Sequence, residues 1–147
     1  MSGTSGDDLR DAASWRRTGL ALGWGAAGCL AAAVLVWLVQ RPGPGASLWV
    51  LLVLGAVGAL LAPVFLRRAW SLPEVQGDPA AARARGWSDV AIIAYCLSVV
   101  LGFVADDLLD LEGSWLVAVR GVLATALVVA YAGMLVLATR WRPVAQL

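Results

Sequence analysis

Three residue types on which much protein chemistry depends are missing from this chain: it has no histidine, no lysine and no asparagine. Without histidine there is no bis-histidine haem ligation, no histidine-based zinc site and no Ser-His-Asp triad, and without lysine no Schiff base. The two cysteines, Cys29 and Cys96, each stand alone in an apolar run, where a thiol behaves as a small hydrophobic group. We therefore expect no catalytic residue, no metal site, no cofactor and no enzymatic activity.

Charge is scarce as well. Charged residues make up 14% of the 147 residues and hydrophobic residues 61%, against about 25% and about 45–50% in an ordinary soluble domain. The apolar residues gather in four runs, each within the 17–25 residues that a helix needs to cross a bilayer. The pattern predicts an all-α integral membrane protein, a four-transmembrane-helix bundle.

Polar, proline and glycine residues mark where the predicted spans end. The spans cover about residues 18–39, 47–66, 88–105 and 115–139, within a single transmembrane domain over residues 15–142. Outside them we expect a mobile N-terminal tail at 1–14, a cytoplasmic loop at 67–87 and a short C-terminal tail at 143–147. In the loop, Asp78 as N-cap, Pro79 as first helical residue and Gly86 after the C-cap predict a short surface helix.

Arginine placement predicts the orientation, because short cytoplasmic loops carry an excess of arginine. Nine of the eleven arginines fall on one side of the predicted spans, at positions Arg10, Arg16, Arg17, Arg67, Arg68, Arg83, Arg85, Arg140 and Arg142. Only Arg41 and Arg120 fall on the other side, so both termini are predicted to be cytoplasmic. Seven of the eight tryptophans lie near predicted span ends, where indole favours the headgroup level, and Trp24 lies deeper.

Small residues form stripes on three of the predicted helices. In the first span, Gly19 and Gly23 lie on one face, and Gly25 and Gly28 lie on the opposite face. The second span carries Gly55 and Ala59 and the third carries Ala94, Ser98 and Gly102. Since small residues let helices approach closely in lipid, two such faces predict a central first helix. The stripes suit packing within the chain, between copies or onto another protein, and packing within the chain is the default.

One ion pair between helices is also predicted. Arg120 lies near the outer end of the fourth span, and Asp106 and Asp107 end the third. An arginine at that depth needs an anion, so pairing with Asp106 or Asp107 would join the two helices. The alternative is an Arg120 side chain that reaches a lipid phosphate.

No motif in the sequence identifies a family or a nucleic-acid-binding surface, which leaves the lipid bilayer as the first partner. We expect a non-enzymatic accessory or assembly subunit that contacts another membrane protein. The alternative is a small homo-oligomeric transporter or channel that uses the Arg120 and Tyr131 face, and a pore former is a third. Because all basic charge is on arginine and only two isoleucines occur, the composition is typical of a high-GC bacterium, and the predicted location is the bacterial cytoplasmic (inner) membrane, multi-pass.

Overall fold

The computed structural model describes residues 4–39, 45–73, 75–108 and 113–142, apart from the side chains at 4–9 and 106–108. These residues form four long helices and no strand: α1 (Thr4–Val39), α2 (Ala46–Trp70), α3 (Pro79–Gly102) and α4 (Ser114–Arg140), with a π-helical segment η1 (Phe103–Leu108) after α3. Each helix is long and apolar enough to cross a membrane. The prediction of an all-helical chain with four such helices is therefore confirmed.

Helix α1 begins earlier than the sequence predicted. It starts at Thr4, so residues 4–14, assigned above to a mobile tail, are helical. Within this extension Ala12 is fully buried in the hydrophobic core, and directly after it the Trp15 ring stacks on Phe65 of α2 with 5.6 Å between centroids. Tertiary packing of this kind stabilises helical turns that local sequence leaves marginal.

The start of α3 is as predicted, but its end is not. Asp78 is the N-cap, its Oδ1 accepting a hydrogen bond from the Ala80 backbone N at 2.8 Å, and Pro79 is the first helical residue. Gly86 does not end a short surface helix, because α3 runs on without interruption to Gly102. One buried face crosses this glycine, comprising Ala81, Ala84, Ser88, Ala91 and Ala94. Continuous packing along that face outweighs the cost of about 1 kcal/mol for a glycine in a helix.

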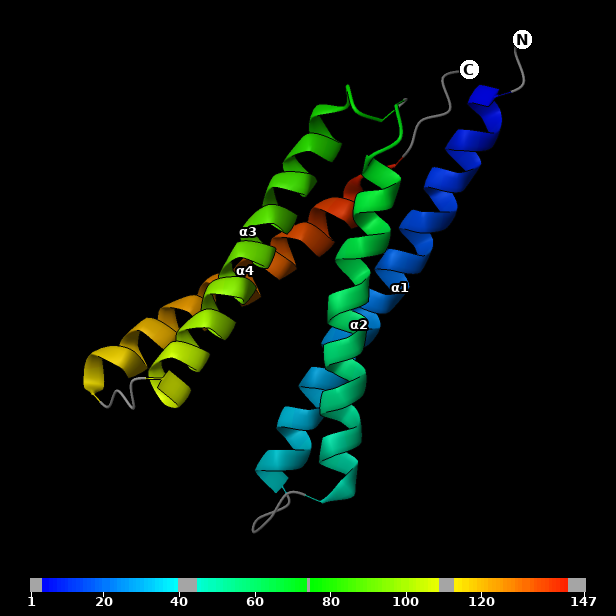
Figure 1. Ribbon diagram of the computed structural model, residues 1–147. Helices are drawn as coiled ribbons and strands as arrows, with labels where there is room; N and C mark the ends of the chain where they lie inside the picture. The colour runs from blue at the N-terminus through cyan, green and yellow to red at the C-terminus, as the bar shows by residue number, and fades with distance from the viewer. Residues whose placement is uncertain (1–3, 40–44, 74, 109–112, 143–147) are drawn as a thin grey trace.

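The four helices form two hairpins, α1 with α2 and α3 with α4, as Figure 1 shows. The hairpins meet at one end, where the start of α1, the end of α2, the start of α3 and the end of α4 lie together, and diverge toward the other end. Helix α1 packs along α2 and only touches α4. The expectation that α1 is the central helix of the bundle is therefore wrong.

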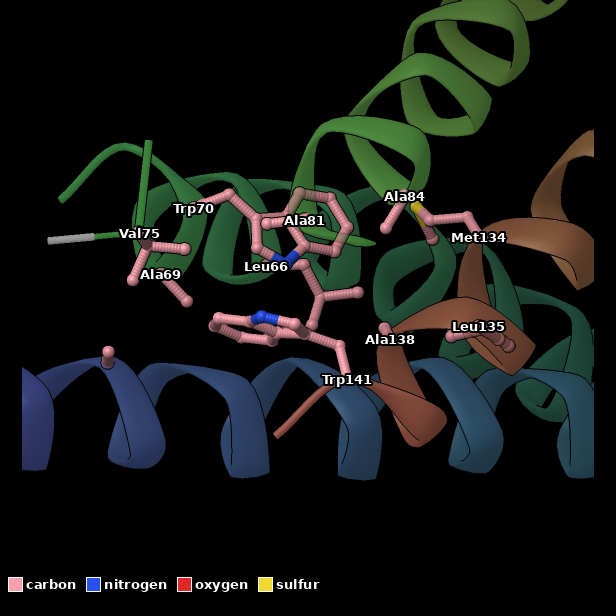
Figure 2. Close-up of a cluster of buried hydrophobic side chains, with 11 residues drawn as sticks. Leu66, Ala69, Trp70, Val75, Ala81, Ala84, Met134, Leu135, Ala138 and Trp141 are labelled. Atoms are coloured by element: carbon pink, nitrogen blue, oxygen red, sulfur yellow. The ribbon is translucent and has the colours of Figure 1, made fainter. Parts of the chain in front are cut away.

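The main hydrophobic core lies where the hairpins meet, a region called the junction below (Figure 2). Its larger side chains are Leu66, Trp70, Met134, Leu135 and Trp141. The rings of Trp70 and Trp141 meet edge to face, with centroids 6.5 Å apart, and are only 1% and 3% exposed. Both tryptophans lie at helix ends, where the sequence placed them, but they are buried in the core, because indole contributes a large apolar area to packing.

Candidate functional site

Helices α1 and α2 are in close contact where small residues were predicted. A Cβ added at Gly58 would lie 3.1 Å from Ala26 Cβ and 3.2 Å from the Leu22 backbone O. A Cβ at Gly55 would lie 2.8 Å from Leu30 Cγ and 3.5 Å from the Ala26 backbone O. The two backbones approach so closely only because these positions have no side chain. Ala59, from the same predicted stripe, is half-buried.

One of the two predicted stripes on α1 faces inward. Gly19 is buried, and a Cβ there would lie 2.7 Å from Leu66 Cγ on α2. Gly23 faces Ala62 on α2 and the Leu135 side chain on α4, so it lies where the two hairpins meet. This stripe therefore serves packing within the chain.

The other stripe on α1 faces outward. Gly25 and Gly28 are exposed, and no described atom outside the local helix lies within 4 Å of a Cβ added at either position. Ala21 on the same face is exposed and Ala32 is half-buried. Within the described chain, this face of α1 has no helix against it. We call Ala21, Gly25, Gly28 and Ala32 the open face of α1.

The predicted face of α3 lies inward, with one exception. Ala94 is buried, and Ser98 is half-buried and donates a hydrogen bond to the Ala94 backbone O at 2.7 Å. The opposite side, with Ile92, Cys96 and Phe103, is exposed. Gly102 is the exception, because nothing described lies within 4 Å of a Cβ there, so it makes no close helix contact.

The predicted ion pair between α3 and α4 lies partly outside the described structure. Arg120 is on α4 and exposed. Asp106 and Asp107 belong to η1, which carries the helix past the predicted end of span 3 as far as Leu108. Their side chains are not among those described, so the pairing of Arg120 with either carboxylate stays a prediction.

A set of polar contacts at the junction was not predicted. Arg16 on α1 donates through Nε to the Ala138 backbone O at 3.0 Å and through Nη2 to the Thr139 backbone O at 2.7 Å. Arg16 thus supplies donors to carbonyls in the last turn of α4, which lack partners within the helix. The Trp24 indole N donates to Thr139 Oγ1 at 3.2 Å. No local sequence signal could have revealed contacts between residues more than 100 positions apart.

Two further contacts connect elements across the junction. The Trp141 indole N donates to Asp78 Oδ2 at 2.7 Å, so the carboxylate that caps α3 also holds the end of α4. Arg67 on α2 forms an ion pair with Asp89 on α3. The sequence contained one signal for this ion pair: Asp89 is a lone carboxylate near the start of the third predicted span, and a carboxylate at that depth needs a partner.

The described residues contain no cluster of three or more His, Cys, Asp or Glu side chains that could hold a metal ion. Cys29 is half-buried and Cys96 exposed, and both are free thiols. Four buried side-chain atoms have no hydrogen-bond partner among the described groups: Arg67 Nε, Trp70 Nε1, Ser88 Oγ and Tyr131 OH. Of these four residues, Trp70 belongs to the core at the junction and Tyr131 packs against it.

Fold and geometry together define an all-helical protein whose four long apolar helices can cross a membrane, arranged as two hairpins joined at one end. A comparison with family models, curated proteins and solved structures finds no match.

Proposed function

We propose that this protein is a non-enzymatic accessory or assembly subunit of a membrane complex, and that the open face of α1 docks against a helix of its partner. The observation that supports this is the pair of exposed glycines, Gly25 and Gly28, with open space around both. In lipid, the hydrophobic effect does not drive helix association, so close backbone contact along small residues is its main basis. On its other side α1 makes such a close contact with α2, since a Cβ added at Gly58 would lie 3.1 Å from Ala26 Cβ and 3.2 Å from the Leu22 backbone O.

The proposal includes the location and orientation of the chain. The two hairpins place the start of α1, the end of α2, the start of α3 and the end of α4 at one end, and these segments carry nine of the eleven arginines. By the excess of arginine on the cytoplasmic side, that end with both termini is cytoplasmic. The arginine-only basic composition supports a bacterial cytoplasmic membrane.

The test compares matched variants in the native membrane. Purified in mild detergent at native abundance, the tagged chain is expected to retain a partner in fixed stoichiometry. Gly25→Leu with Gly28→Leu should abolish this association without loss of thermal stability, because the added side chains enter open space. Val34→Leu, at a position 57% exposed and about half a turn around α1 from Gly25, is the control and should retain the partner.

Two outcomes contradict the proposal. Equal partner retention by the glycine variant and the control would show that the open face of α1 is not the docking surface. A symmetric oligomer of this chain alone that makes liposomes permeable would favour a homo-oligomeric transporter or channel instead.

A further inference from the structure

A surface hollow of about 520 Å³ lies at the end of α2, next to the N-terminal part of α3. Its lining consists of Val64, Arg67, Arg68 and Ser71 together with Arg85 from α3. The volume is within the range of about 300–1,000 Å³ that small-ligand sites have.

The hollow carries excess positive charge. Three guanidinium groups line it, and one carboxylate, that of Asp89, pairs with Arg67. Among the described side chains, two positive charges are therefore left in excess within one small volume. Like charges held this close repel one another, so an anion that enters the hollow is stabilised by both.

Two of these arginines are held in place by neighbouring side chains. The Arg68 guanidinium lies over the Trp15 ring at 4.9 Å from its centroid, and Trp15 itself stacks on Phe65. Arg67 is fixed by Asp89, while its buried Nε has no acceptor among the described groups. The planar fork of arginine matches the geometry of phosphate oxygens.

The apolar side of the hollow indicates where such a phosphate comes from. Val64 is 58% exposed, and Arg67 and Arg68 follow directly after the apolar run of α2. In the membrane placement proposed above, this is the level of the lipid headgroups on the cytoplasmic side, where basic pockets between helices bind anionic headgroups.

We propose that the hollow binds the headgroup phosphate of an anionic phospholipid, with the acyl chains alongside Val64. The inference rests on the proposed membrane placement but does not require the partner protein. Inorganic phosphate offers the same anion without acyl chains, and the excess of two positive charges disfavours a zwitterionic lipid.

The test is lipid titration of the purified full chain in detergent, followed by native mass spectrometry. Phosphatidylglycerol, phosphatidylcholine and inorganic phosphate are the three probes. The test variant is Arg68→Gln with Arg85→Gln. The control, Arg83→Gln with Arg140→Gln, removes the same charge from exposed residues at the same end of the molecule that do not line the hollow.

The chain should bind phosphatidylglycerol more tightly than phosphatidylcholine. The test variant should weaken phosphatidylglycerol binding roughly 30-fold, from the typical contribution of each basic residue near an anionic surface. The control should change the affinity for phosphatidylglycerol less than about threefold. Its arginines lie outside the hollow, where water and salt screen their charge from a lipid bound inside it. If the double variant does not fold, Arg85→Gln alone, at an exposed position, should weaken binding about fivefold.

Three results would overturn the proposal. If the test and control variants bind phosphatidylglycerol equally weakly, the lipid is attracted to the whole charged surface and not to the hollow. If phosphatidylglycerol and phosphatidylcholine bind equally well, the hollow does not select for a negatively charged lipid. If inorganic phosphate displaces phosphatidylglycerol and binds with the same affinity as that lipid, the hollow is a site for a soluble anion. This test is independent of the test of partner docking, because Gly25→Leu with Gly28→Leu should leave lipid binding unchanged. A chain released from membranes by carbonate would instead contradict the membrane placement.

Discussion

At Gly58 a single missing side chain sets the distance between α1 and α2. The nearest atoms to an added Cβ are Ala26 Cβ and the Leu22 backbone O, neither of which can rotate away. Gly58→Leu should therefore destabilise the protein by about 1–3 kcal/mol, the usual cost of overpacking. This loss of stability is measured by thermal unfolding in detergent, monitored through tryptophan fluorescence. The matched control is Gly28→Leu, which enters open space and should cost nothing; equal losses would contradict the assigned faces of α1.

Arg120 gives a second prediction for single residues. If it pairs with Asp106 or Asp107, Arg120→Asp should lower thermal stability by placing two like charges together. Exchanging the charges, with Asp106→Arg or Asp107→Arg added, should restore part of the loss. A pairing role is excluded if neither double variant recovers stability and Arg120→Gln is harmless, in which case contact with a lipid phosphate explains Arg120.

At the scale of the element, α3 has one face against the protein and one against its surroundings. Ala94→Leu and Ser98→Leu insert a larger side chain on the packed face and should each cost about 1–3 kcal/mol. Val100→Leu, at a position 57% exposed, should have little effect.

Gly102 tests the same helix where sequence and structure disagree. The sequence placed Gly102 on the packed face, but an added Cβ meets nothing within 4 Å. Gly102→Leu should therefore be as stable as the unchanged chain in the same unfolding assay. A loss as large as that of Ala94→Leu would show that this end of α3 packs more closely than described.

At the scale of the whole molecule, the two hairpins depend on the junction. Arg16 donates to two carbonyls in the last turn of α4, and hydrogen bonds from charged groups contribute about 1.5–3 kcal/mol. Arg16→Gln should therefore loosen the hairpins relative to each other. Spin labels at Val39 and Val117, both exposed, should then show a broader distance distribution in a background without Cys29 and Cys96. Arg17→Gln, at the exposed neighbouring position, is the control and should leave the distribution unchanged.

The orientation of the whole molecule has its own test. In a cysteine-free background, single cysteines replace Ala80 in the arginine-rich segment and Asp110 between the third and fourth predicted spans. In intact cells, a membrane-impermeant thiol reagent should label position 110 and not position 80, because excess arginine keeps its segment inside. The reverse pattern would invert the proposed orientation.

Much of the fold follows from the sequence alone. The four apolar runs predict four helices, Asp78 and Pro79 predict the start of α3, and the periodicity of small residues predicts its packed face at Ala94. These are local properties, since length, capping and helical spacing depend on residues within a few turns of one another.

Other features were decided only by the tertiary structure. The two glycine stripes of α1 are chemically alike, and only the position of α2 makes Gly19 and Gly23 inward and leaves Gly25 and Gly28 open. Trp70 and Trp141 are buried against each other rather than exposed at the helix ends because the hairpins bring together segments distant in sequence. The contact of Arg16 with the last turn of α4 has the same origin. Such pairings depend on how whole helices approach one another, and that information is absent from any single stretch of sequence.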